Sequence, residues 1–251
     1  IAHAFYGVPN IDVIILFPIK EVTDNQRKQM TTLGGNIQAI AIDGKFDNAQ
    51  YMVKEAFADK RLNAIKLTSA NSINIARLLP QAVYYFWAYS RLVDDIDDEI
   101  IFSVPSGNFG DLMGALFAWK MGLPVRRLVV ATNANDEFPT FLETGEYGRI
   151  DPSRRCISNA MNVGHPSNLP RLIDMFGGTM DENGVITTGP DMEMMNNLIF
   201  STSVNDDDTR RTIADTYREE GLVLEPHGAV GWRGLNRYLE RFPGDRARIC
   251  V

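Results

Sequence analysis

Short apolar runs alternate with helix-length segments in this chain, and this alternation constrains the fold more than any other feature. Val13 to Phe17 predicts a buried strand, Gln26 to Leu33 a helix closed by two glycines, and Ile37 to Ile42 the next strand. Strands joined through a helix run parallel, as in a β-α-β unit. The sequence therefore predicts an α/β protein with mostly parallel, doubly wound sheets.

The alternation continues along the rest of the chain. Further strands are predicted at Ile100 to Val104 and Arg127 to Thr132. Further helices are predicted at Asp47 to Asp59, Ile73 to Leu92 with a kink at Pro80, Gly110 to Gly122, Arg171 to Met175, Asp191 to Asn197 and Thr209 to Glu220. Two acidic runs, Asp94 to Glu99 and Asn205 to Thr209, are expected to be surface loops.

Composition excludes several classes of protein. The formal net charge is -7 at pH 7 and the basic residues are not clustered, so we expect no nucleic-acid partner. Cys156 and Cys250 lie far apart without nearby histidines, so we expect neither a disulfide framework nor a metal site, and a reducing, cytoplasmic location fits. Apolar stretches such as Asp12 to Pro18 are far shorter than the roughly 20 residues of a membrane helix, so no membrane partner is expected.

The segment VPSGNFGD, Val104 to Asp111, lies where a predicted buried strand turns into a helix. In an open α/β sheet, ligands bind at the carboxyl ends of the strands. Gly107 and Gly110 allow close approach of the backbone, and the amides of such a turn at a helix N-terminus favour a phosphate group. The alternative interpretation is a tight turn in which Asp111 complements the helix dipole. The segment matches neither a P-loop nor a dinucleotide fingerprint.

A longer match surrounds this turn. The stretch SVPSGNFGDLMGALFAWKMGLPVRRLVVATNAND, Ser103 to Asp136, resembles the threonine synthases, a family of pyridoxal-phosphate enzymes. Collinear segments that resemble the same family are QMTTLGGNI (29–37), LTSANSINIARLLPQAVYYF (67–86), SNAMNVGHPSNLPRL (158–172) and LEPHGAVGWRGL (224–235). The resemblance covers the whole chain.

The resemblance implies the type II fold of pyridoxal-phosphate enzymes, with residues 1–66 ending a small α/β domain and residues 67–251 forming most of a large one. It implies conversion of O-phosphohomoserine and water to threonine and phosphate, with pyridoxal 5'-phosphate as cofactor and a monomer or homodimer as the assembly. The cofactor phosphate would be held by a loop of five residues, which are Ser106, Gly107, Asn108, Phe109 and Gly110.

The resemblance also predicts that this chain is an interior fragment, incomplete at both ends. The family's Schiff-base lysine, in a Phe-Lys-Asp setting, and its Ser-Gly-Asp-Thr-Gly substrate loop would precede residue 1, and its Thr-Ala-His-Pro block would follow residue 251. The lysines present lack that setting; they are Lys20, Lys28, Lys45, Lys54, Lys60, Lys66 and Lys120. We therefore expect no catalytic residue in this chain and no activity from it alone.

Other polar residues have two interpretations each. In SANSIN, residues 69–74, the family match favours Asn71 and Asn74 as cofactor-site residues, whereas helix capping explains the short polar side chains equally well. His165 and His227 have no nucleophile nearby in sequence, which favours structural roles. Asn133 and Asn135 follow a strand and either face the crevice or form the turn.

Three further hypotheses stand beside the main one. The run DDIDD, Asp94 to Asp98, looks like a magnesium-diphosphate site, but such a site needs facing helices, and a solvated loop is the better interpretation. A threonine-synthase-like phospholyase would share the fold and cofactor and release an oxo-acid and ammonia. A non-catalytic module that binds a phosphate ligand would keep the glycine-rich loop without the chemistry.

Overall fold

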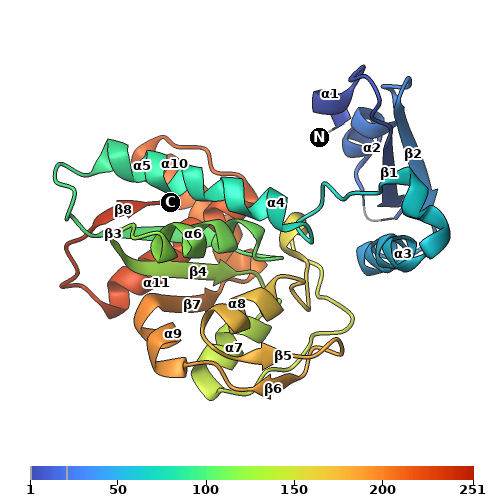
Figure 1. The fold of residues 1–251 in the computed structure, drawn as a ribbon. Helices are drawn as coiled ribbons and strands as arrows, with labels where there is room; N and C mark the ends of the chain where they lie inside the picture. The colour runs from blue at the N-terminus through green and yellow to red at the C-terminus, as the bar shows by residue number, and fades with distance from the viewer. Residues whose placement is uncertain (1, 21) are drawn as a thin grey trace. The chain divides into compact units, whose positions relative to one another are not determined.

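The computed structural model describes residues 2–20 and 22–251 and divides the chain into two compact units, Ile1–Ala70 and Asn71–Val251 (Figure 1). Each unit has its own sheet, and each is described by itself below. The expected domain limits at residues 66 and 67 stay a prediction.

The first unit contains the predicted β-α-β unit. Strands β1 (Val13–Pro18) and β2 (Ile37–Ile42) pair in parallel, with Val13 opposite Ile37. The helix between them, α2 (Asp24–Thr31), is capped by Thr23, whose hydroxyl accepts a hydrogen bond from the Gln26 amide at 3.3 Å. The unit also contains α1 (Ala2–Phe5), α3 (Phe46–Ala58) and a 3-10 turn (Lys60–Ile65).

The second unit is built on a four-stranded parallel sheet with the order β7-β4-β3-β8. Its strands are β3 (Ile100–Pro105), β4 (Val125–Thr132), β7 (Ile199–Ser203) and β8 (Arg248–Cys250). From β3 the chain moves outward through β4 to β7 and then returns to the other side of β3 as β8. The strand order thus reverses beside β3, and ligands of open α/β sheets bind at such a reversal.

Helices cover both faces of this sheet (Figure 1). Alternate residues of β3 enter different cores: Phe102 packs with α5 (Ala82–Leu92) and α6 (Gly110–Lys120), whereas Ile101 packs with Tyr238 of α11 (Pro226–Arg241). Helix α10 (Asp206–Glu220) packs on α11. The remaining elements are α7 (Glu137–Thr144), a 3-10 turn (Asn159–Met161), α8 (Leu169–Met175), α9 (Met192–Leu198) and the hairpin of β5 (Thr179–Met180) and β6 (Ile186–Thr188). Because apolar residues line both faces of the central strands, the doubly wound prediction is confirmed.

The helix predicted at 73–92 is broken at Pro80, as expected. It consists of α4 (Ile75–Leu78), a 3-10 turn (Leu79–Gln81) and α5. Proline lacks the amide proton that a continuous helix needs, which accounts for the break.

One acidic run is a loop and the other is not. Residues 94–99 form an exposed loop in which the Asp98 carboxylate accepts hydrogen bonds from the amides of Asp94 and Asp95, each at 3.3 Å. The loop prediction for Asn205 to Thr209 is wrong, because α10 begins at Asp206 and the Asn205 side chain caps it. The acidic residues occupy the first turn, where the positive end of the helix dipole stabilises negative charge.

Candidate functional site

The turn from β3 into α6 has a backbone conformation that the neighbouring strand and the core hold in place. The Ser106 amide donates to the Ala131 carbonyl at 2.8 Å, which fixes the turn to the neighbouring strand. Phe109 has a positive φ of 60°, a conformation that non-glycine residues rarely adopt. Its side chain is buried and its ring packs edge-on against Phe138 at a centroid distance of 4.9 Å. Core packing therefore stabilises the strained residue.

Main-chain amides of this loop have hydrogen atoms available for a ligand. Within residues 2–20 and 22–251, the structure records partners for the amides of Ser106 and Met113 and none for the amides between them. Those amides include the first turn of α6, where a helix leaves its donors unpaired and carries partial positive charge. The arrangement matches an anion site.

The two loop glycines differ in what surrounds them. A Cβ atom on Gly107 would lie 2.8 Å from the Cα of Met161, which is too close for any real side chain. A Cβ atom on Gly110 would make an ordinary contact of 3.5 Å with Ser72. Glycine is therefore required at 107 by the close approach of the 3-10 turn at Asn159–Met161.

The side chain of Asn108 holds the loop in place. Its Nδ2 donates to the Ser72 hydroxyl at 2.7 Å, and its Oδ1 accepts from the Ser167 amide at 2.5 Å. Its main-chain carbonyl accepts from Nδ2 of Asn168 at 2.8 Å. Three segments distant in sequence thus meet at Asn108, and sequence reasoning missed Ser167 and Asn168. The only sequence signal for that pair was the resemblance of the segment 158–172.

The segment 71–74 lies beside the loop. Ser72 links Asn71 to Asn108, because the Ser72 hydroxyl donates to Oδ1 of Asn71 at 3.0 Å and accepts from Asn108. Asn74 caps α4, with its Oδ1 accepting from the Ala76 amide at 3.0 Å. The structure therefore brings Asn71 close to the loop through Ser72 and gives Asn74 a capping contact.

The turn after β4 is satisfied internally. The amide of Asn133, 1 % exposed, donates to the Ser158 hydroxyl at 3.2 Å and to Oδ1 of Asn162 at 3.0 Å. Its Oδ1 accepts from the main-chain and side-chain nitrogens of Asn135 at 3.0 and 2.8 Å. Of the two interpretations of these asparagines, these contacts support turn formation.

Both motif histidines contact protein groups. His227 accepts a hydrogen bond from the Ala160 amide at Nε2, 3.1 Å away, and its Nδ1 donates to the Glu225 carboxylate at 2.5 Å. Nδ1 of His165 lies 2.6 Å from the Tyr147 hydroxyl. These contacts agree with structural roles.

Glu137 is a buried carboxylic acid that sequence reasoning missed. It is 4 % exposed, and its Oε2 has no hydrogen-bond partner among the described residues. Burial raises the pKa of Glu137 to about 7, with a smaller contribution from the neighbouring Asp136 carboxylate. The position at the start of α7 was the only sequence signal, and it equally suits an exposed helix-dipole acid.

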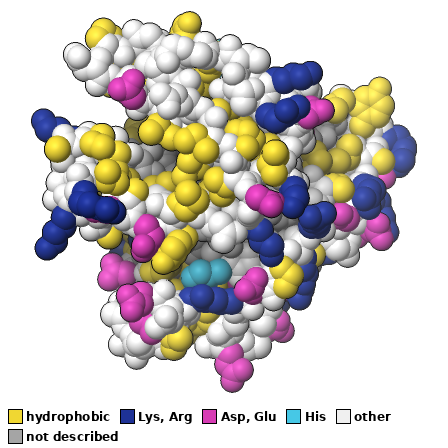
Figure 2. Space-filling model, turned by 90° about the vertical axis from the view of Figure 1, so that its right-hand side faces the viewer, with side chains coloured by type: hydrophobic (Ala, Val, Ile, Leu, Met, Phe, Trp, Pro, Cys, Tyr) yellow, Lys and Arg dark blue, Asp and Glu magenta, His cyan; other side chains and the backbone are white. Residues whose placement is uncertain are grey.

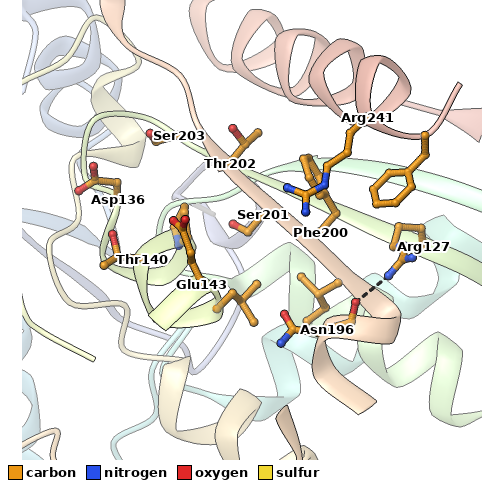
Figure 3. Close-up of a pocket in the computed structure, with 14 residues that line it drawn as sticks. Arg127, Asp136, Thr140, Glu143, Asn196, Phe200, Ser201, Thr202, Ser203 and Arg241 are labelled. Carbon is orange, nitrogen blue, oxygen red and sulfur yellow. Dashed lines mark hydrogen bonds between the residues drawn. The ribbon is translucent and has the colours of Figure 1, made fainter. Parts of the chain in front are cut away.

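A separate cavity of about 630 Å³ lies along β7 (Figure 3). Its lining includes Ser201 and Thr202 of β7, Arg127 of β4, and Asp136 and Glu143 at the other side. Arg127 Nη1 donates to the Asn196 carbonyl at 2.7 Å, as Figure 3 shows. None of the lining residues belongs to the loop after β3, so this cavity is not part of the candidate site.

The face in Figure 2 and the described side chains show neither a basic surface nor a metal cluster. On the face in Figure 2, Lys and Arg side chains lie among Asp and Glu side chains and form no continuous basic surface. Among the described residues, no group of three or more His, Cys, Asp or Glu side chains is placed to hold a metal ion. No helix in the described ranges has the length and apolarity needed to cross a membrane.

Comparison with known proteins connects this site to a class of enzymes. The family model described as pyridoxal-phosphate dependent enzyme matches residues 1–251. The threonine synthase of Escherichia coli strain K12 is 42 % identical over 246 residues, which is 98 % of this chain and 54 % of that protein. The crystal structure of Escherichia coli threonine synthase has a TM-score of 0.84 at 41 % identity, covering 99 % of this chain and 54 % of that one.

A structure described as PLP-bound threonine synthase from Brucella melitensis has a TM-score of 0.83 at 32 % identity and covers 99 % of this chain and 55 % of that chain. The chain thus spans about half the length of the relatives that it matches. It belongs to the pyridoxal-phosphate dependent enzyme family, and its fold is that of the type II members. The sequence resemblance to the threonine synthases is confirmed, and the cofactor of the family is pyridoxal phosphate.

The residues present fit the phosphate end of that cofactor. The loop after β3 offers main-chain donors without protein acceptors at the start of a helix of 11 residues. The second unit contains one lysine, Lys120, at the opposite end of α6 with its Nζ 4.9 Å from the centre of the Trp119 ring. A helix of that length separates it from the loop by about 15 Å.

Proposed function

We propose that the enzyme containing this chain is a threonine synthase, which converts O-phosphohomoserine and water to threonine and inorganic phosphate with pyridoxal 5'-phosphate as its cofactor. The proposal rests on one observation above all. The similarity to threonine synthases extends over 98 % of the chain at 42 % identity, and the anion-binding geometry falls on the loop for which that resemblance predicts phosphate binding.

In this proposal the loop residues Ser106 to Gly110 bind the cofactor phosphate through main-chain amides. The dipole of α6 and the unpaired amides favour a dianionic group. Asn108 keeps the loop in shape through Ser72 and Ser167. When bound, the cofactor supplies an electron sink for carbanion chemistry at the substrate.

Asn71 and Asn74 are proposed to line the same site. Support for Asn71 is its link through Ser72 to the loop. The contact of Asn74 with the Ala76 amide supports a capping role as well, so its part in the site is the weaker of the two. We also propose that the enzyme is a monomer or a homodimer and that it is located in the cytoplasm.

We further propose that no residue of this chain is covalently bonded to the cofactor. Lys120, the lysine of the second unit, lies at the far end of α6 from the loop. Lys20 of the first unit is exposed and ion-paired with Asp43 at 2.8 Å. We assign the covalent partner to a part of the enzyme outside these 251 residues, because none of the seven lysines has the Phe-Lys-Asp setting of the family.

The experiment is an analysis of reaction products with proteins purified from a host that lacks its own threonine synthase. The complete enzyme and the 251-residue chain are each incubated with pyridoxal phosphate and O-phosphohomoserine, and threonine, phosphate, oxo-acid and ammonia are measured. We expect the complete enzyme to release threonine and phosphate in equal amounts and the chain alone to release neither. An oxo-acid with ammonia would instead establish the phospholyase, and threonine from the chain alone would overturn the assignment of the covalent residue.

A further inference from the structure

Arg171 is linked to the loop after β3 through two other segments, which its guanidinium joins. Its Nη1 donates to Oδ1 of Asn168 at 2.5 Å, and its Nη2 donates to the carbonyl of Ile73 at 2.6 Å. Arg171 and Ile73 are 98 positions apart in the sequence. The planar fork of an arginine suits such a two-directional contact, which a lysine cannot reproduce.

The hydrogen bonds continue from Arg171 to the loop. Asn168 is fully buried, and its Nδ2 donates to the carbonyl of Asn108. On the other branch, Ile73 follows Ser72, whose hydroxyl accepts from the Asn108 side chain. Arg171 therefore supports Asn108 at two points. One is the main-chain carbonyl of Asn108, which Asn168 contacts, and the other is the side chain of Asn108, which Ser72 contacts.

The charge of Arg171 is not neutralised by a neighbouring carboxylate. Both recorded hydrogen-bond acceptors are uncharged, and among the described residues no ion pair of Arg171 is recorded. The side chain is partly buried, and burial lowers the pKa of its guanidinium with no charged neighbour to oppose the shift. A partly buried cation without a counter-ion is costly unless an anion lies nearby.

We propose that Arg171 is a positioning residue for the phosphate site: it fixes the loop through Asn168 and Ile73 and supplies the positive charge behind it that a bound phosphate dianion balances. The inference rests on the proposed function, because it takes the loop after β3 to bind the cofactor phosphate. It adds a cation to a site that otherwise consists of neutral main-chain donors.

The test measures binding of pyridoxine 5'-phosphate and of pyridoxine to the purified chain by calorimetry. Neither compound has an aldehyde, so neither can bond to surface lysines, and the two differ only in the phosphate group. Arg171→Met should raise the Kd for pyridoxine 5'-phosphate about tenfold or more and leave the Kd for pyridoxine unchanged. Arg171→Lys, which keeps the charge but loses the fork, should show a smaller loss for the same ligand.

Arg127→Met provides the matched control. Like Arg171, Arg127 donates to two uncharged oxygens, in this case the main-chain carbonyls of Asn196 and Asn197 at 2.7 and 2.6 Å, but it lines the cavity along β7. Its replacement should reduce stability while leaving both dissociation constants as in the wild type. Circular dichroism of each variant verifies that the fold is retained, and Arg171→Lys serves if Arg171→Met does not fold.

The outcomes separate the two proposals. If the wild type prefers the phosphate ester and the Arg171 variants retain that preference, the Arg171 inference is wrong and the proposed function stands. The same holds if the variants lose affinity for both compounds equally, since that result indicates general damage. If the wild type binds the ester no better than pyridoxine, both proposals are overturned.

Discussion

Two neighbouring strands of one sheet, β3 and β4, end in polar turns that differ in how their hydrogen-bonding groups are satisfied. In the turn after β4, the side chains of Asn133 and Asn135 bond to each other and to the segment 154–162. In the turn after β3, Asn108 bonds to distant segments, and the main-chain amides around it keep no recorded partner among the described residues.

The difference shows how two similar turns of one sheet can differ in the main-chain donors that they leave available for a ligand. Buried donors are normally satisfied within the protein, and the turn after β4 follows that rule. The partly exposed turn after β3 leaves main-chain donors without a protein partner where the helix dipole and the order of the strands both favour a ligand. Unpaired main-chain donors, more than the residue types, distinguish the proposed binding turn after β3 from the structural turn after β4.

The largest effect is expected in the structural turn. Asn133→Ala removes a buried amide and takes away hydrogen bonds that Asn135, Ser158 and Asn162 make with it. We expect the free energy of unfolding to fall by about 4 kcal/mol in urea titrations, with the affinity for pyridoxine 5'-phosphate unchanged in the folded protein. A large loss of affinity at normal stability would show that this turn also binds the ligand.

The next effect concerns the pH dependence of Glu137, which follows the same turn. Its pKa is raised from 4.5 to about 7 in the folded protein, so the folded state holds the proton more tightly than the unfolded state. Its contribution is full below pH 4.5 and is lost as the pH rises to about 7. The loss is about 3 kcal/mol at 1.36 kcal/mol for each pKa unit.

In Glu137→Gln, the free energy of unfolding should no longer fall between pH 4.5 and about pH 7. Urea titrations between pH 4 and pH 8 would detect the difference from the wild type. Glu143→Gln, which removes an exposed charge from the same helix, is the control. An unchanged pH profile in Glu137→Gln would mean that the carboxyl group is solvated and that the turn after β4 is less closed than described here.

A third change acts on the proposed binding turn after β3. Gly107→Ala places a methyl group 2.8 Å from the Cα of Met161, and overpacking of this kind costs about 2 kcal/mol. Because the strain falls on the loop itself, affinity for pyridoxine 5'-phosphate should fall together with the free energy of unfolding. Gly110→Ala, which meets only ordinary contacts, should be stable, and equal destabilisation by both changes would contradict the geometry of the turn.

The smallest effect separates the two interpretations of Asn74. If Asn74 acts as the cap of α4, Asn74→Ala should lower the free energy of unfolding by about 1 kcal/mol, and Asn74→Asp, which keeps the acceptor, should retain it. Equal stability of all three proteins with weaker ligand binding would indicate a residue of the site instead.

The parts of the fold that could be predicted are those with a strong local pattern. Residues Ile100 to Val104 are apolar except for Ser103, and they form the central strand β3. Strand β7, Ile199–Ser203, was not predicted, because its sequence IFSTS is polar and short, as suits the edge of the sheet. Packing against β4 determines it.

Helix α11 was also not predicted, and its glycines explain why. Gly231 and Gly234 lower helix propensity, yet a Cβ on Gly234 would lie 2.5 Å from the Cβ of Ala131. The carbonyl of Gly231 accepts from the buried Ser103 hydroxyl at 2.7 Å. Close contact of α11 with the sheet therefore requires glycines, which in the sequence alone indicate interruptions of a helix.

For the candidate site, the loop was predictable and its support was not. Position after a strand, two glycines and a helix start are local features that indicated residues 106–110. Ser167 and Asn168 contact Asn108 across 59 and 60 residues, and Arg171 acts through Asn168. Contacts between residues so far apart in the sequence form only when the chain folds, and no local pattern in residues 158–172 predicts them.

The most direct test of the account observes the loop amides themselves. Nuclear magnetic resonance spectra of the chain with ¹⁵N-labelled glycine are recorded during titration with pyridoxine 5'-phosphate and, separately, with pyridoxine. The account predicts saturable shifts of the Gly107 and Gly110 amide signals with the phosphate ester and none with pyridoxine. Unchanged Gly107 and Gly110 signals at saturating phosphate ester would contradict the claim that the turn after β3 binds phosphate.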